Sequence, residues 1–241
     1  MNSIKKRIVI NFMFIIVITV IILEFFLITG IQKNYYENLE DILTNQIQTS
    51  IDIYVKYFAD ATLQENVLNN VDVFWKQATA QVEIIDMDGQ VMMNSQGILD
   101  DSVTEMDVQI ALQGKRGKWI GSIPYDTEKV MAVACPIVVD DKQVGVLRFI
   151  ASLREVNNEI RSIAWSYLFF GGVVIIFSGL VSIILANSIV KPIKELTLVA
   201  EQMAMGNYKV KSEQKSKDEI GKLSETLNYL ASEVLKKDEL K

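Results

Sequence analysis

The side chains that most often carry out chemistry in proteins are scarce in this chain of 241 residues. It contains no histidine, which excludes Ser-His dyads, imidazole metal ligands and phospho-accepting histidines from these residues. It contains one cysteine, Cys135, which excludes an intramolecular disulfide and a CxxC site. The sequence also has no glycine-rich phosphate-binding loop and no ATP-binding motif of a kinase. We therefore expect no catalytic residue, bound cofactor or metal site in this chain.

Charged residues offer the remaining binding chemistry. Four aspartates could supply oxygen ligands to a cation: Asp86, Asp88, Asp100 and Asp101. Their spacing does not match a calcium-binding loop, so we interpret them as turn and surface residues. The chain carries 24 lysines and arginines against 30 aspartates and glutamates, a formal net charge of −6. Because it has no basic patch, nucleic acid is not an expected partner.

Two long apolar runs dominate the sequence, half of which is hydrophobic. Residues 8–31 contain one charged residue, Glu24, and residues 163–190 contain none. As a helix the first run rises about 36 Å, which exceeds the roughly 30 Å of a bilayer's hydrocarbon core. It is also longer than the apolar region of a signal peptide and lacks a good cleavage site. We predict two transmembrane helices, the first an uncleaved anchor.

Two details of these spans bear on function. Glu24 lies in the outer third of the first span, where it can reach water or take up a proton, so we favour no special role for it. Ser178, Ser182 and Ala186 form a stripe of small residues that permits close helix contact. Whether this stripe contacts another subunit stays open.

Basic residues fix the predicted orientation in the cell membrane. Lys5, Lys6 and Arg7 precede the first span, and Lys191 and Lys194 follow the second. The cytoplasmic parts are therefore predicted to be residues 1–7 and 191–241, and the extracytoplasmic part residues 32–162.

The extracytoplasmic part reads as a mixture of helices and strands. The pattern predicts helices at 36–58 and 63–78, strands at 81–85 and 90–95, a helix at 102–114 opened by a capping box, strands at 118–123, 128–139 and 143–152, and a helix from 153 into the second span. Asp88-Gly89 and residues 140–142 are the predicted hairpin turns. Pro136 lacks an N–H and is expected at a sheet edge or a bulge. This order favours one antiparallel sheet with flanking helices, an α+β fold.

The same order resembles the extracytoplasmic PAS-like (single Cache) sensors of bacterial receptor kinases. The resemblance rests on residues 82–86, 88–89, 95, 111–114, 135–137 and 145–148. It implies that Trp119, Tyr125 and Arg148 belong to a candidate sensor pocket, although Trp119 and Cys135 also suit a core. Arg148 could pair with an anionic ligand or with a neighbouring carboxylate, and the sequence leaves both open. The stimulus is not predicted.

The cytoplasmic part contains two short apolar seams. Ile193, Leu196, Ala200 and Met203 form the first, and Ile220, Leu223, Leu227, Leu230 and Val234 form the second. Such narrow stripes need partner helices, which favours a parallel coiled coil in a homodimer. Gly206 is predicted to end the first helix, and a capping box at 216–219 to open the second. With Pro192 at the start and Asp218-Glu219-Ile220-Gly221 at the second helix, this part looks like a HAMP signal-transmission domain.

The whole arrangement resembles the sensory half of a bacterial receptor histidine kinase that ends before the kinase core. The resemblance implies transmembrane signalling by a homodimer, with ATP and Mg²⁺ needed only in the kinase core. The implied partners are membrane lipid, an unidentified extracellular stimulus and a cytoplasmic response regulator. A non-enzymatic methyl-accepting chemoreceptor and a HAMP-linked nucleotide cyclase are alternatives, so whether the parent protein is an enzyme stays open.

Overall fold

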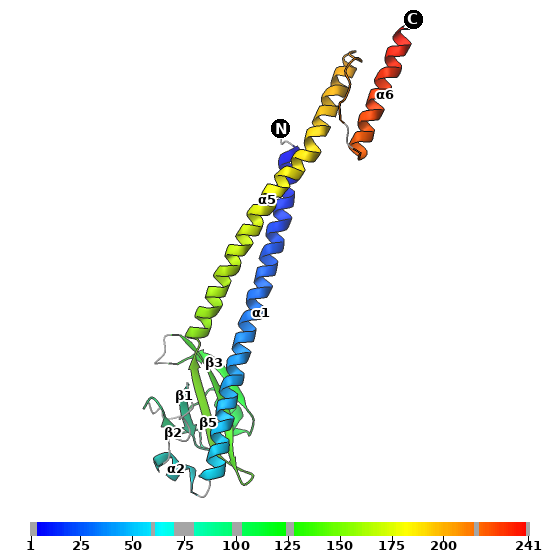
Figure 1. Cartoon of the computed structure of the whole chain (residues 1–241). Coiled ribbons are helices and arrows are strands. Elements are labelled where there is room, and N and C mark those ends of the chain that lie inside the picture. The colour runs from blue at the N-terminus through cyan, green and yellow to red at the C-terminus, as the bar shows by residue number, and fades with distance from the viewer. Residues whose placement is uncertain are drawn as a thin grey trace. The chain divides into compact units, whose positions relative to one another are not determined.

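The computed structural model describes residues 4–58, 61–69, 80–97, 103–123, 128–214 and 217–239. Its elements are α1 (Ile4–Tyr57), α2 (Leu63–Asn69), β1 (Gln81–Ile85), β2 (Val91–Asn94), α4 (Met106–Leu112), β3 (Gly117–Ser122), β4 (Lys129–Val139), β5 (Lys142–Ser152), α5 (Arg154–Ala204) and α6 (Glu219–Glu239) (Figure 1). The chain divides into two compact units. We call residues 26–165 the sheet unit, and residues 1–25 with 166–241 the helical unit.

The sheet unit is built on one antiparallel sheet with the strand order β2-β1-β5-β4-β3. Both predicted hairpins are confirmed. Asp140 and Asp141 join β4 to β5 with φ of 49° and 61°, the left-handed values of a tight hairpin turn. Gly89 closes the β1–β2 turn at φ 83°. There the Asp86 Oδ1 accepts hydrogen bonds from the backbone N–H of Asp88 and of Gln90, both at 2.9 Å, so Asp86 acts as a turn residue. Asp100 and Asp101 lie outside the described residues.

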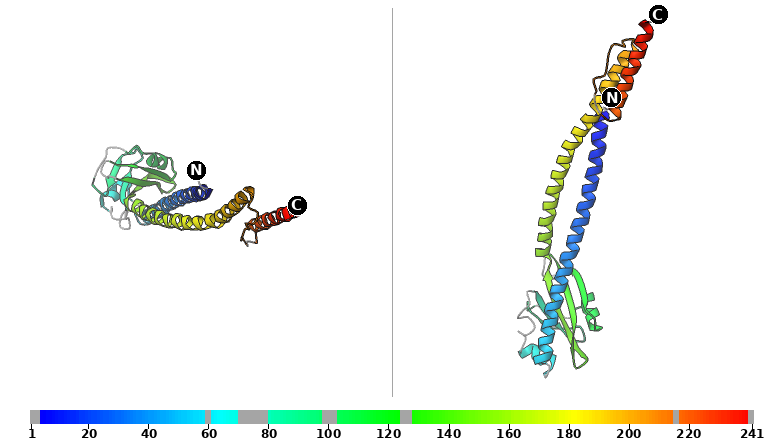
Figure 2. Two further views of the ribbon diagram at one scale, coloured as in Figure 1. Left: turned by 90° about the horizontal axis from the view of Figure 1, so that it is seen from above. Right: turned by 45° about the vertical axis from the view of Figure 1, so that its right-hand side comes forward.

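Both faces of the sheet are covered, which explains why the central strands are almost continuously apolar. One face packs against α1, which lies along it (Figure 2). This cluster contains Leu43, Ile47, Ile51 and Tyr54 of α1 together with Val82, Ile84, Met131, Val133, Leu147 and Phe149 of the sheet. The other face packs against α4 through Val108 and Ala111, which contact Ile85, Ala134 and Val146. Alternation along each strand therefore assigns each side chain to one of two buried layers.

Two local predictions had different outcomes. Pro136 pairs with Val146 of β5 beyond the last β3–β4 pair, which is Gly117 with Ala134, so Pro136 lies at a locally open edge as predicted. The predicted start of the helix at 102 is wrong, because α4 begins at Met106 and its N-cap residue, Glu105, makes no side-chain cap bond. The physical reason is that the N–H of Val103 donates to the carbonyl of Gly89 at 3.1 Å, which keeps this segment extended. Ser102 of the predicted capping box lies outside the described residues.

The helical unit contains most of the two apolar runs, and the helices that carry them, α1 and α5, are long and apolar enough to cross a membrane. The α5 helix continues through Pro192 without a break. Ser182 and Ala186 are 4% and 0% exposed within the single chain. A Cβ at Gly179 would lie 3.4 Å from the sulfur of Met13 on α1. Two residues of the predicted stripe are therefore buried within the single chain, and a contact of the stripe with another subunit stays a prediction.

Candidate functional site

Arg148 of β5 is the centre of a buried ionic cluster in the sheet unit. Its Nε and one terminal nitrogen donate hydrogen bonds to the two oxygens of Asp107, at 2.7 and 3.1 Å. Its other terminal nitrogen donates to Glu83 at 3.0 Å. The guanidinium carbon lies 5.8 Å from the ring centre of Trp119, within range of a cation–π contact. One cation thus joins β1, β3, β5 and α4.

The charges in this cluster do not balance. Arg148, Glu83 and Asp107 are 2%, 4% and 0% exposed, so two buried carboxylates share one guanidinium. Burial raises the pKa of Glu83, and the opposing effect of Arg148 does not fully offset it. Burial lowers the pKa of Arg148, but the two carboxylates outweigh burial and the pKa is raised, so Arg148 stays charged. Asp107 and Glu83 therefore both pair with Arg148, and these three buried residues comprise two carboxylates and one cation.

A hydrogen bond from the side chain of Asn94 holds the acid of β1, Glu83, in place. Asn94 of β2 donates from Nδ2 to Glu83 Oε1 at 3.0 Å. Its Oδ1 accepts from the backbone N–H of Gln96 at 2.7 Å, which fixes the amide orientation. Glu83 also lies directly opposite Arg148 in the β1–β5 register. The position of this carboxylate follows from strand pairing and a turn contact together.

Of the two roles left open for Arg148, the structure shows the pairing with carboxylates, and a role in ligand binding stays a prediction. Arg148 pairs with neighbouring carboxylates, and Trp119 is half-buried beside it. Tyr125 lies outside the described residues. Sequence reasoning missed Glu83 and Asp107. Each lies among apolar residues whose spacing places its position on a buried face of a strand or helix. An acidic residue inside the apolar strand 81–85 was the available signal.

The cluster lies close in sequence to the helix that leaves the sheet unit. β5 ends at Ser152, and α5 begins at Arg154. Between them Leu153 is fully buried, and its N–H donates to the carbonyl of Lys129 at 2.9 Å. One turn later, Asn157 Oδ1 accepts a hydrogen bond from the Tyr36 hydroxyl of α1 at 3.0 Å. Any shift of β5 therefore reaches the start of α5 directly.

A second site lies in the helical unit, where the chain folds back between α5 and α6. Gly206 ends α5 at φ 91°, as predicted. Ser212 of the connector donates its N–H to Asn228 Oδ1 at 2.8 Å and accepts at its carbonyl from Asn228 Nδ2 at 2.9 Å. Gln214 is hydrogen-bonded to Glu195 of α5. The connector is thus fastened to both helices.

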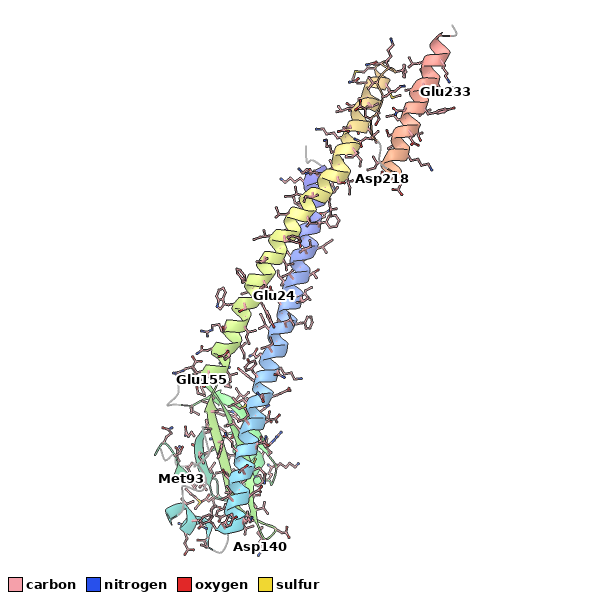
Figure 3. The ribbon with its side chains drawn as sticks, viewed as in Figure 1. Glu24, Met93, Asp140, Glu155, Asp218 and Glu233 are labelled. Carbon is pink, nitrogen blue, oxygen red and sulfur yellow. The ribbon has the colours of Figure 1, made fainter. Side chains whose placement is uncertain are left out.

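The start of α6 differs in detail from the predicted capping box. Asp218 Oδ1 accepts hydrogen bonds from the backbone N–H of Ile220 at 3.0 Å and of Gly221 at 3.1 Å, and so caps the helix (Figure 3). Glu219 is the first residue of α6 and is exposed. Ser216 lies outside the described residues. The charged tetrapeptide at 218–221 therefore has a local structural role.

The predicted seam residues come together only in part within one chain. A groove is lined by Ile193, Leu196, Thr197, Ala200, Leu223 and Leu227. Leu196 is buried, whereas Leu223 and Leu230 are 56% and 54% exposed. On the described part of α6 the buried residues are small: Gly221, Ser224 and Ala231. One chain therefore buries the small residues of α6 and leaves Leu223 and Leu230 more than half exposed.

Known proteins resemble both units. A family model of the HAMP domain matches residues 184–236. Sensor histidine kinase WalK of Bacillus subtilis (strain 168) is 22% identical over 97% of this chain, and sensor protein kinase WalK of Staphylococcus aureus (strain JH9) is 20% identical over the same share. The chain spans about 40% of the length of these relatives.

Solved sensor domains are also similar to part of the chain. The sensor domain of E. coli DcuS has a TM-score of 0.39 at 18% identity, covering 51% of this chain and 97% of that one. The sensor domain of the V. cholerae histidine kinase DctB has a TM-score of 0.31 at 16% identity, covering 50% and 55%.

The antiparallel sheet, the two apolar helices and the HAMP match confirm the predicted α+β membrane architecture with a HAMP domain. Together with the WalK relatives, they indicate a membrane protein with an extracellular sensor. The chain contains a HAMP domain and is homologous to the sensor half of WalK-type sensor histidine kinases, which makes it a sensing and signal-transmission module of the two-component type.

Proposed function

We propose that the chain detects a stimulus outside the cell and relays it through its HAMP domain to a protein-histidine kinase core in the complete protein. The carrying observation is that one chain joins the sheet unit to a HAMP domain and matches WalK kinases over 97% of its length. This match favours the kinase over a chemoreceptor or a nucleotide cyclase. In this proposal ATP and Mg²⁺ bind the kinase core, and a response regulator receives the phosphoryl group.

The relay uses the ionic cluster and α5. A stimulus that favours one arrangement of Arg148 and its carboxylates shifts β5, and β5 continues into α5 after a single residue. The α5 helix runs to Ala204, inside the HAMP match. A coupling of about 1–3 kcal/mol is enough to change output several-fold to a hundredfold. A stimulus can shift the equilibrium between the two signalling states only by the difference between its binding free energies for them.

The output side of the proposal requires a homodimer. Leu223 and Leu230 of α6 are more than half exposed in one chain. A second copy would cover these leucines with its own seam, which buries apolar surface on both chains. The two copies then form a four-helix bundle that has two packings, each favoured by one signalling state.

Topology is tested first, because the relay needs residues 1–7 and 191–241 in the cytoplasm and residues 32–162 outside. Single cysteines at Ser122→Cys and Lys222→Cys, in a Cys135→Ala background, occupy exposed positions. A membrane-impermeant maleimide applied to intact cells should label position 122 and should label position 222 only after permeabilisation. Equal labelling of both positions in intact cells would overturn the proposal.

Activity is tested on the complete protein in nanodiscs with radiolabelled ATP and Mg²⁺. We expect phosphoryl transfer to a histidine and then to an aspartate of a response regulator. Residues 1–241 alone are the control, because they contain no histidine. Cyclase activity, or recruitment of a separate kinase with no autophosphorylation, would assign the module to one of the other two receptor classes.

A further inference from the structure

Glu24 of α1 packs directly against Gly171 of α5 inside the helical unit. A Cβ placed on Gly171 would overlap the Glu24 carboxylate and would lie 3.0 Å from Val20. Figure 3 places Glu24 on α1 beside α5. Glu24 is the sole charged residue between Arg7 and Lys33. On α5, the span 163–190 has no charged residue at all. The carboxylate therefore meets a backbone surface that only glycine leaves open.

The neighbouring glycine, Gly172, shows that the close contact with α1 is specific to Gly171. A Cβ on Gly172 would meet no described heavy atom within 4 Å. The two glycines are adjacent in one helix, yet only Gly171 faces α1. Further along the same helix, Gly179 lies against Met13, and Ser182 and Ala186 are buried. Gly171 is thus one end of a small-residue face, and Glu24 is the polar group seated on that end.

We propose that Glu24 and Gly171 are a positioning pair that sets the register and rotation of the two membrane helices during signalling. Sliding α5 by one turn would bring Tyr167 or Ile175 opposite Glu24, and neither leaves room for the carboxylate. Rotating α1 would turn the carboxylate toward hydrocarbon, which disfavours it. The pair permits small shifts of α5 and opposes a one-turn slide. The inference rests on the membrane spans of the proposed function.

The test measures the helix contact by disulfide cross-linking of the whole chain in lipid nanodiscs. Met13→Cys and Gly179→Cys, in a Cys135→Ala background, place the two thiols at the second point of contact. An intramolecular disulfide is scored as a monomer band of altered mobility. Gly171→Ala is compared with Gly172→Ala, which adds the same methyl group and the same helix propensity one residue away.

We expect Gly172→Ala to cross-link at the parental rate and Gly171→Ala to lose cross-linking several-fold. Adding Glu24→Ala to Gly171→Ala should restore the rate, because the shortened side chain vacates the overlapped space. Glu24→Gln, which keeps size and shape, should leave it unchanged. Equal rates for the two alanine variants, or no recovery in the double variant, would overturn the inference.

The experiment separates this inference from the proposed function. Cysteine labelling at positions 122 and 222 reports topology independently of the helix contact. Correct topology with no effect of Gly171→Ala refutes the positioning pair and leaves the sensing module standing. A wrong topology removes the proposed function, whereas a cross-linking loss confined to Gly171→Ala would still establish the contact.

Discussion

Replacing Arg148 with methionine should strongly destabilise the sheet unit. The substitution keeps an unbranched side chain of similar length, but it removes three hydrogen bonds and the cation–π contact. It leaves Glu83 and Asp107 buried with no cation between them. Removing one partner of a buried ion pair costs about 3–5 kcal/mol. Because two carboxylates are stranded here, we expect a loss at or above the upper end of that range.

Cys135 supplies a built-in assay for this loss. It is the sole cysteine, it lies in the α1-facing core, and burial raises its pKa to about 11, so the folded unit protects it from thiol reagents. Labelling of the chain in nanodiscs at fixed, mild urea reports how often the unit opens. At about 1.4 kcal/mol per factor of ten, a loss of about 5 kcal/mol in Arg148→Met should speed labelling by roughly several thousandfold.

Two further variants make the reasoning refutable. Lys142→Met, at the exposed start of the same strand, should change the free energy of unfolding by no more than about 0.5 kcal/mol. Adding Glu83→Gln to Arg148→Met should recover part of the stability, since it removes one stranded charge. If Arg148→Met labels no faster than Lys142→Met, the cluster does not hold the unit together.

Three other perturbations follow from the same contacts. Because burial raises the pKa of Glu83 above its ordinary 4.5, the folded unit binds a proton more tightly than the unfolded chain. Its free energy of unfolding should therefore rise as the pH falls through the folded pKa toward 4.5 and decline again as the pH rises, and Glu83→Gln should abolish this dependence in urea titrations followed by tryptophan fluorescence. Asn228→Ala removes both hydrogen bonds to Ser212, at about 1 kcal/mol each, and should speed hydrogen exchange at the Ser212 amide without unfolding α5. Asp218→Ala removes the cap of α6 and should cost about 1 kcal/mol, seen as faster exchange confined to the first turn of that helix.

The features that the sequence predicted correctly are those set by neighbouring residues. Asp88-Gly89 and Asp140-Asp141 make tight turns because their own backbone preferences favour left-handed φ. The helices follow from long apolar runs and from seams with helical spacing. Pro136 is restricted to an edge by its missing N–H, wherever the sheet lies. None of these inferences required knowing which strands pair.

The features that the sequence did not predict depend on residues that lie far apart in the chain. Asp107 and Glu83 are 41 and 65 residues from Arg148, and only the sheet register brings them to it. The helix predicted from Ser102 starts later because a carbonyl in the β1–β2 turn captures the Val103 amide. The small-residue stripe was recognised, but the burial of Ser182 and Ala186 within one chain could not be predicted without the packing of α5. Long-range pairing decided each of these points.

The packing of the sheet unit restricts how a stimulus can act on α1 and α5. The α1 helix is held to one sheet face by Leu43, Ile47 and Ile51, whereas the Arg148 cluster lies on the opposite face. A rearrangement of the cluster therefore reaches the α1 core only through β5, whose Leu147 and Phe149 pack in that core. The hydrogen bond between Tyr36 and Asn157 ties α1 to the first turns of α5, so in the proposed relay a shift at the start of α5 also acts on α1. In the proposed relay, a stimulus that prefers one arrangement by about 1–3 kcal/mol is enough to bias the output.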